Sequence, residues 1–395
     1  MKLLQVNVTV NSGSTGRIAE DIGKVMMRNG HESAIAFGRG DRPSESRKIR
    51  IGGKLNVYNH VIQTRLLDNH GFSSVKATKQ FLREIKNFQP DVVGLHNLHG
   101  YYLHVGILFK YLKQHEIPVV WTLHDCWPFT GHCTYFDRVG CEKWKTHCQN
   151  CPLTGYYPQS WFMDRSFLNF EDKRTLFTGH PNLTIVTPSR WLKDLVKQSF
   201  LNEYRVRVIH NGVDTDVFKP YENIRKKKIV LGVASQWSER KGLNDFFKLH
   251  KELPEEVEVV LIGLKPSQIK RLPRGIKGIE RTESTEELAK WYSRATVFVN
   301  PTYIDNFPTT NIEALACGTP VITYDTGGSP EAVDETTGFV VEQGDLEGVV
   351  QSLHTISEKN RESYREPCRK RAVEYYNKED RFQDYVELYE RMLGK

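Results

Sequence analysis

Short apolar runs alternate with amphipathic stretches through the first half of the chain. The apolar runs predict strands at Leu3–Thr9, Ser33–Phe37, Asp91–Leu95, Val119–Leu123 and Leu183–Pro188. Apolar residues at helical spacing predict helices at Ile18–Met27 and Thr78–Asn87. Strands that are separated by helices indicate a parallel sheet with both faces covered.

The second half repeats this pattern and predicts a second sheet. Its expected strands are Val206–Ile209, Lys228–Val233, Val257–Ile262, Thr296–Asn300 and Val321–Tyr324. An amphipathic pattern from Arg369 to Leu393 predicts a terminal helix. We therefore expect an α/β protein with two Rossmann-like, doubly wound parallel-sheet domains, residues 1–200 and 201–375, with the boundary near residues 199–205.

Composition and charge narrow the class of protein. Of the 395 residues, 39% are hydrophobic and 26% are charged, as is typical of globular proteins. No apolar run is long enough for a transmembrane helix, and the N-terminus lacks a signal-peptide pattern, so we expect a cytoplasmic protein. Residues 1–200 carry 26 Lys and Arg against 16 Asp and Glu. This excess favours an acidic partner, such as the inner face of an anionic membrane. Nucleic-acid binding is not expected, because the sequence contains no basic stretch with interleaved aromatic residues.

The most informative stretch runs from Asp305 to Glu331. An acidic residue and seven spacers precede Glu313 in a short predicted helix, and Gly327-Gly328 follows the next strand. Helix N-termini attract phosphate, and a carboxylate can accept hydrogen bonds from both hydroxyls of a diol. Each piece alone is an ordinary helix start or stop signal, but together they suit a nucleoside diphosphate sugar.

This stretch resembles the donor-binding signature of retaining GT-B glycosyltransferases of the family 4 type (glycosyl transferases group 1). The glycine turn Gly13–Gly16 and the residues after Leu95 resemble members that make exopolysaccharide and capsule. The resemblance implies two domains that face a cleft, with acceptor binding in the first. It also implies that residues 376–395 form a helix that packs back on the first domain.

The resemblance assigns donor-binding roles. Glu313 would bind the ribose and Asp305 a hydroxyl of the donor sugar. Lys241 and Arg240 would hold the diphosphate. The backbones of Gly13, Gly16, Phe307, Thr309 and Thr310 would also contact it. The sequence departs from the family pattern at Asp305 (usually Glu), Pro308 (usually Gly) and Gln236 (usually Arg).

Polar residues follow two strands of the first domain. His124-Asp125 ends the strand 119–123, and Asn97 and His99 follow the strand 91–95. The family has a His at the place of His124, close to the reacting sugar, so we count His124 as catalytic together with Asp305 and Glu313. Asn97, His99 and Asp125 are expected on the acceptor side. A structural role for His124 is an equal alternative from the sequence alone.

The expected activity is transfer of a sugar from a nucleoside diphosphate sugar to a hydroxyl of a glycan or lipid-linked glycan. The resemblance favours a UDP-sugar, with a GDP-sugar as the alternative, and requires no cofactor for catalysis. A nucleotide-sugar epimerase, a sugar phosphorylase or a non-catalytic nucleotide-sugar-binding protein of the same fold remain alternative interpretations.

Five of the seven cysteines lie in an irregular insertion, residues 126–151. Cys148 and Cys151 have the spacing of a metal knuckle, and Cys133 and Cys141 could complete a structural zinc site. Cys126 and His132 are alternative ligands, and an iron–sulfur cluster is a further possibility. The competing interpretation is a set of reduced thiols, as is usual in the cytosol.

Overall fold

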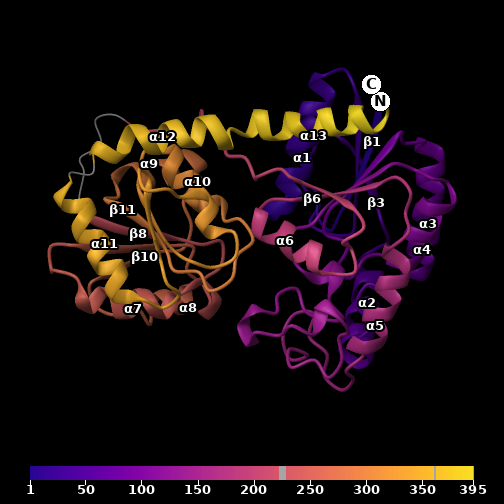
Figure 1. The fold of residues 1–395 in the computed structure, drawn as a ribbon, viewed down its shortest axis with the longest axis horizontal. Helices are drawn as coiled ribbons and strands as arrows, with labels where there is room; N and C mark the ends of the chain where they lie inside the picture. Colours follow the sequence, from indigo (N-terminus) through magenta and orange to yellow (C-terminus); the bar gives the residue numbers. More distant parts are fainter. Residues whose placement is uncertain (222–227, 360–361, 395) are drawn as a thin grey trace. The chain divides into compact units, whose positions relative to one another are not determined.

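The computed structural model describes residues 1–221, 228–359 and 362–394. The chain forms two compact units, each built on its own sheet (Figure 1). The first unit comprises Met1–Ile209 with Phe382–Lys395, and the second comprises His210–Arg381. Within the described ranges, no helix combines the length and the apolar character needed to cross a membrane.

The first unit contains a seven-stranded parallel sheet with the strand order β3-β2-β1-β4-β5-β6-β7. Its strands are β1 (Lys2–Asn7), β2 (Glu32–Phe37), β3 (Arg47–Arg50), β4 (Val92–Leu95), β5 (Val119–Thr122), β6 (Leu183–Thr187) and β7 (Arg205–Val208). Its helices are α1 (Gly13–Arg28), α2 (Lys54–Leu67), α3 (Val75–Phe88), α4 (Val105–Gln114), α5 (Ser166–Phe177) and α6 (Arg190–Gln198).

Both faces of the inner part of this sheet are buried, which explains why β4, β5 and β6 are mostly apolar, whereas the edge strands β3 and β7 carry exposed Arg and Lys side chains. Alternate residues of one strand enter different clusters, because successive side chains point to opposite faces. Val93, Val119 and Trp121 pack in one cluster, whereas Val92 and Val120 pack in the other. The parallel sheet predicted for the first half of the chain is therefore confirmed.

The second unit contains a six-stranded parallel sheet with the order β10-β9-β8-β11-β12-β13. Its strands are β8 (Ile229–Val233), β9 (Glu258–Ile262), β10 (Ile276–Ile279), β11 (Val297–Asn300), β12 (Val321–Tyr324) and β13 (Gly338–Val341). Its helices are α7 (Leu243–Glu252), α8 (Pro266–Ile269), α9 (Thr285–Arg294), α10 (Thr309–Ala316), α11 (Leu346–Glu358) and α12 (Glu362–Tyr376).

Each sheet has one point where the strand order reverses. In the first unit, β1 and β4 are neighbours, and the chain continues outward from each in opposite directions. In the second unit, β8 and β11 hold the same positions. The loops after these central strands diverge, and this leaves room for a ligand at the carboxyl ends.

Two predicted boundaries need correction. The strand predicted at Val206–Ile209 was assigned to the second domain, but β7 pairs with β6 and so extends the first sheet. The helix predicted across Arg369–Leu393 is interrupted at Asn377, which forms a β-bridge with Val213. The Lys378 amide then donates to the Val213 carbonyl oxygen (3.0 Å), and α13 (Lys378–Met392) begins there.

The later part of α13 belongs to the first unit. Phe382, Tyr385, Val386 and Tyr389 are buried with α1 and with one face of the first sheet. His31 reinforces this packing through the Glu390 carboxylate, 3.3 Å from its Nε2. The first unit is therefore completed by residues that lie more than 170 positions beyond its main segment.

This packing predicts that Leu388→Ala destabilises the first unit. Leu388 is 5% exposed in the cluster beside α1, and truncating such a side chain costs about 2–4 kcal/mol. Scanning calorimetry should show a transition that is lower by several degrees. Glu387→Ala, at an exposed position one residue earlier, is the matched control and should leave the transition in place. Equal transitions for both variants would contradict this packing.

Candidate active site

Three neighbouring strands of the second unit carry most of the predicted donor-binding residues. The loop after β8 leads to Arg240 and Lys241, and the loop after β11 contains Asp305 and leads into α10. The loop after β12 contains Gly327 and Gly328. Because β8, β11 and β12 are adjacent and parallel, their carboxyl ends bring these loops together.

Glu313 lies on α10 and is held by a buried tyrosine. The Tyr292 hydroxyl, from α9, donates to Glu313 Oε2 at 3.0 Å. Burial, and then the charge of Glu313, raise the pKa of Tyr292 well above its usual value, so the tyrosine remains a donor. A carboxylate has about four acceptor positions, so Glu313 can keep this bond and still accept from a diol.

Lys241 and Asp305 form an ion pair between the first and second of these loops. The Lys241 ammonium donates to Asp305 Oδ2, and the two side chains are 20% and 17% exposed. Limited exposure strengthens such a pair relative to one in open solvent. The ammonium is therefore placed beside the carboxylate that was predicted to contact the donor sugar.

Arg240 supports the loop after β11. Its Nη1 donates to the Ile304 carbonyl at 2.5 Å, and its own carbonyl accepts from the Tyr303 amide at 2.8 Å. These two bonds fasten the loops after β8 and β11 to each other. The structure thus gives Arg240 a bracing contact next to Asp305, in addition to the charge that the sequence predicted.

Glycine is required where these loops approach most closely. Gly327 has φ +56°, and a Cβ there would lie 1.9 Å from the Asp305 carbonyl oxygen. The Gly328 amide donates to the same oxygen at 3.1 Å. Gly242, with φ +72°, would place a Cβ 2.2 Å from the Pro301 carbonyl oxygen. The positions of Asp305 and Lys241 therefore depend on glycine at these turns.

Helix α10 starts four residues after Asp305, the acidic member of the Lys241–Asp305 ion pair. Pro308 is the N-cap residue of the helix and makes no side-chain capping hydrogen bond to the first turn, which begins with Thr309 and Thr310. An uncapped first turn attracts anions through its amide groups. Phe307 is only 3% exposed, and its ring stacks on His210 with the centroids 4.7 Å apart, so its side chain belongs to the core.

In the first unit, His124 lies at the end of a hydrogen-bonded chain. Gln5 Nε2 donates to the Ala19 carbonyl at 2.7 Å, which fixes the orientation of the Gln5 amide. Gln5 Oε1 is then the acceptor for His96 Nε2 at 3.1 Å. His96 Nδ1 lies 3.2 Å from His124 Nε2, and the two rings are nearly parallel.

This chain determines which nitrogens carry protons. Burial, and then the charge of His124, lower the pKa of His96 well below its usual value. Burial lowers the pKa of His124 to about 4, although the Asp125 carboxylate opposes the shift. With both rings neutral and His96 Nε2 protonated, His124 donates through Nε2 and keeps Nδ1 as an acceptor. His124 is thus suited to accept a hydrogen bond from a hydroxyl.

His99 and Asp125 form a second buried pair beside this chain. His99 Nε2 donates to Asp125 Oδ2 at 2.7 Å, and the Trp127 amide donates to Oδ1 at 3.0 Å. Burial alone would raise the pKa of Asp125, but His99 and these hydrogen bonds lower it. The Tyr157 hydroxyl lies 3.0 Å from His99 Nδ1, so the segment that follows the insertion brings a tyrosine to the predicted acceptor residues.

Asn97 and the glycine turn lie near the end of β1. The Asn97 amide donates to Asn7 Oδ1 at 3.3 Å, across the reversal point between β1 and β4. Gly13 starts α1 with φ +69° and open space around it. A Cβ on Gly16 would lie 2.6 Å from Thr9 Oγ1, so the first turn of α1 packs closely on the preceding loop.

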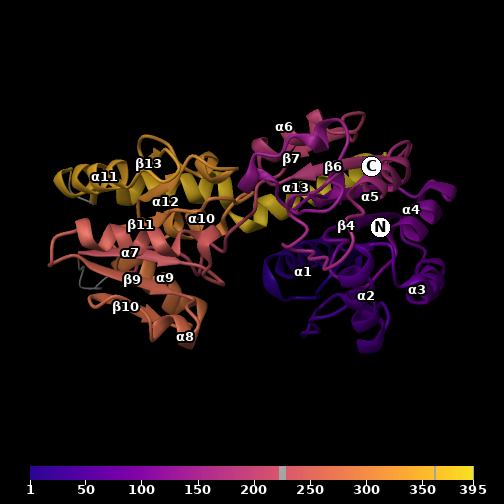
Figure 2. The ribbon, with the colours of Figure 1, turned by 90° about the horizontal axis from the view of Figure 1, so that it is seen from below.

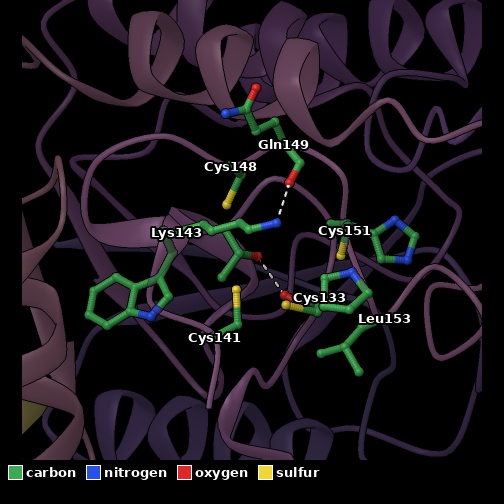
Figure 3. A pocket seen from close by; sticks show the side chains of 11 residues that line it. Cys133, Cys141, Lys143, Cys148, Gln149, Cys151 and Leu153 are labelled. Atoms are coloured by element: carbon green, nitrogen blue, oxygen red, sulfur yellow. Dashed lines mark hydrogen bonds between the residues drawn. The ribbon is translucent and has the colours of Figure 1, made fainter. Parts of the chain in front are cut away.

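The cysteine insertion does not show a metal site. Cys133, Cys141, Cys148 and Cys151 line one cavity together with Lys143 (Figure 3). Across the described part of the chain, no group of three or more His, Cys, Asp or Glu side chains is arranged to hold a metal ion. The predicted zinc site therefore receives no support from this structure.

The cysteines of the insertion form no disulfide, and the pKa values of their thiols differ. None of the chain's seven cysteines forms a disulfide. Burial raises the pKa of Cys148 to about 11, whereas a hydrogen bond from Cys133 lowers that of Cys151 to about 7. Lys143 Nζ donates to the carbonyl oxygens of Gln149 (3.0 Å) and Asn150 (3.1 Å), so the Lys143 side chain holds this loop.

Comparison with solved structures defines the class of protein. Sucrose-phosphate synthase from Thermosynechococcus elongatus superposes with a TM-score of 0.75 at 17% identity, covering 100% of this chain and 99% of that one. HepE from Anabaena, in complex with UDP-glucose, superposes with a TM-score of 0.68 at 13% identity, covering 99% and 100%. The two parallel-sheet units therefore form the GT-B fold of glycosyltransferases, as the sequence predicted.

Sequence comparison then gives the family. A family model described as Glycosyltransferase Family 4 matches residues 15–217, and one described as Glycosyl transferases group 1 matches residues 227–359. The chain belongs to this family of glycosyltransferases. One relative, named as the colanic acid biosynthesis glycosyl transferase WcaC of Escherichia coli (strain K12), is 25% identical over 99% of this chain and 100% of its own length.

Several residues that shape the site were not predicted. Tyr292 holds Glu313 and Tyr157 contacts His99, but neither tyrosine lies in a recognisable motif. Gln5, which orients the His96–His124 pair, could have been identified from the sequence. It is a fully buried amide in an otherwise apolar strand, and such a residue requires hydrogen-bond partners.

The histidine chain predicts that His124 stays neutral across the physiological range. With a pKa of about 4, its imidazole is neutral above that pH and becomes charged only below it. Imidazole ¹⁵N NMR should show an unprotonated Nδ1 and no titration between pH 5.5 and 8. A titration midpoint above 6 for His124 would contradict the proposed tautomer.

Proposed function

We propose that the protein is a retaining glycosyltransferase. It moves a sugar from a nucleoside diphosphate sugar to a hydroxyl of a glycan or lipid-linked glycan in cell-surface polysaccharide synthesis. The observation that carries this proposal is the juxtaposition of Glu313, the Lys241–Asp305 pair and the start of α10 at adjacent strand ends. The names of WcaC and of HepE with UDP-glucose support a polysaccharide product and a UDP-sugar donor.

The donor binds to the second unit in this proposal. Glu313 accepts hydrogen bonds from the ribose hydroxyls while Tyr292 holds its other bond. Lys241 and the first-turn amides of Thr309 and Thr310 bind the diphosphate, since cations and helix N-termini both attract phosphate oxygens. Asp305 lies beside Lys241 and accepts from a hydroxyl of the donor sugar.

The transfer step needs no protein nucleophile. The bond from the sugar C1 to the phosphate oxygen breaks, and the acceptor oxygen bonds to C1 on the same face. The acceptor proton passes to the departing phosphate, so charge develops on the diphosphate. Lys241 stabilises that charge, which is the kind of electrostatic term that contributes most to catalysis.

The first unit receives the acceptor in this proposal. Asn97, His99 and Asp125 follow β4 and β5, and Tyr157 contacts His99 from the segment after the insertion. His124 accepts a hydrogen bond from a sugar hydroxyl through Nδ1, in keeping with the protonation of the His96–His124 chain. His124 therefore positions a hydroxyl and does not serve as a general acid.

Two substitutions test the donor site. Glu313→Gln should lower kcat/KM about 100-fold, because a neutral amide cannot accept two strong bonds from a diol. Lys241→Ala should lower kcat about 100- to 1,000-fold, since the departing diphosphate loses its cation. The assay is release of free nucleotide from UDP-, GDP- and ADP-sugars, with and without glycan acceptors.

Exposed residues of the same types provide controls. Glu347→Gln on α11 and Lys248→Ala on α7 should retain full activity. Full activity of Glu313→Gln and Lys241→Ala would contradict the assignment of the donor site. Conversion of the sugar without nucleotide release would instead identify an epimerase. Donor binding without turnover, in the presence of acceptors, would identify a binding protein.

A further inference from the structure

Helix α2 of the first unit buries polar residues and exposes apolar ones, which is the reverse of an ordinary surface helix. Its only buried residues are His60 and Thr64, both polar. Leu55, Tyr58 and Ile62 are instead 86%, 70% and 45% exposed. Globular proteins normally bury the apolar stripe of a helix, so this face of α2 is available to a partner.

Hydrogen bonds hold α2 in this orientation. His60 donates through Nδ1 to Ser74 Oγ (2.8 Å) and accepts at Nε2 from the Gly71 amide (3.2 Å). Burial lowers the pKa of His60 to about 3, so the ring stays neutral and keeps both bonds. Rotating the helix to bury its leucines would break these bonds and bury unpaired polar groups.

A second exposed apolar segment adjoins the end of α2. Trp161, Phe162 and Met163 are consecutive and are 61%, 78% and 49% exposed. The Trp161 amide donates to the Arg65 carbonyl at 2.7 Å, and the Arg65 guanidinium lies over the Trp161 ring, 5.8 Å from its centroid. Together the two segments form an apolar patch, which comprises Leu55, Tyr58, Ile62, Leu66, Leu67, Trp161, Phe162 and Met163.

The charges around the apolar patch are basic. Residues 47–67 contain five Lys or Arg and no Asp or Glu. Lys54 begins α2 and Arg50 lies four residues earlier, and both are exposed. In the second segment, the nearest acidic residue is Asp164, whose carboxylate accepts from the amides of Cys151 (2.6 Å) and Ser166 (2.8 Å). The patch therefore suits a partner that has an apolar interior and an anionic surface.

We propose that the apolar patch docks the protein onto an anionic lipid bilayer surface. Trp, Tyr and Phe favour the boundary between lipid headgroups and acyl chains, and Lys and Arg are attracted to anionic headgroups. Helix α2 lies at the periphery of the first unit, where it can lie along a flat surface (Figure 2). Insertion of Trp161 and Phe162 beside it supplies the apolar contribution.

A second copy of the chain fits the patch less well. A twofold interface sets the same surface of both copies face to face. It would bring Lys54 and Arg65 of both copies together, and α2 itself has no acidic side chain to pair them, although Lys48 nearby in the sequence is paired with Asp41. Charged residues are normally depleted from interface cores. Binding to lipid is also independent of the proposed transfer reaction, because it requires neither donor nor catalytic residues.

Vesicle flotation of the full-length protein tests the proposal. The protein should float with vesicles of phosphatidylglycerol and phosphatidylcholine and bind much less to phosphatidylcholine alone. Trp161→Ser/Phe162→Ser and Leu55→Ser/Tyr58→Ser should each weaken partitioning about tenfold or more. Lys54→Glu should weaken it at low salt, and 0.5 M salt should weaken binding of the wild type.

The matched control uses exposed apolar residues of the second unit. Val373 and Tyr375 are 39% and 49% exposed, so Val373→Ser/Tyr375→Ser should bind vesicles like the wild type. Circular dichroism and nucleotide release should be unchanged in all variants, which separates this proposal from the proposed transferase function. If the serine variants fail to fold, quenching of wild-type tryptophan emission by brominated lipids, reduced in Trp161→Phe, provides the same test.

Three results would overturn the proposal. The first is absence of wild-type binding to anionic vesicles at millimolar lipid. The second is binding by the patch variants that equals that of the wild type. The third is a dimer at micromolar concentration, measured by light scattering, that the patch variants dissociate, since this would assign the patch to a second copy of the chain.

Discussion

The reversal of strand order in each parallel sheet is the constraint on which the site depends. Crossover connections are right-handed, so a chain that changes direction in its sheet leaves the loops of two adjacent strands diverging at their carboxyl ends. The reversals lie between β1 and β4 and between β8 and β11. Asn97 follows β4, and Asp305 follows β11, so the candidate residues lie where the topology leaves room for a ligand.

The loops at the second reversal point are held by close backbone contacts. Gly327 and Gly242 allow the neighbouring loops to approach within distances that a side chain would prevent. Arg240 then joins the loop after β8 to the Ile304 carbonyl, and the Tyr292 hydroxyl donates a hydrogen bond to the Glu313 carboxylate. The polar groups of the site are therefore oriented before a ligand arrives, and this reduces the entropy lost on binding.

The fold class could be predicted from the sequence, because apolar runs and their spacing are local signals. The roles of the two carboxylates, Asp305 and Glu313, stay predictions. The sequence could not predict that β7 joins the first sheet, since an edge strand has the same pattern in either domain. Helix α2 was not predicted, because its buried residues are polar and so it lacks the buried apolar stripe that indicates a helix. Tyr292 and Tyr157 meet their partners through tertiary packing, which no local pattern encodes. The zinc site indicated by the clustered cysteines stays a prediction, because spacing alone does not determine how thiols are arranged.

We propose that one nucleoside diphosphate sugar site lies at the ends of β8, β11 and β12. Amide hydrogen exchange, measured with and without a UDP-sugar, tests it most directly. Donor binding should slow exchange at residues 239–242, 305–313 and 325–328 and leave it unchanged at α8 and β10 of the same unit. Unchanged exchange in those three loops at a saturating donor concentration, with protection elsewhere in the unit, would contradict it.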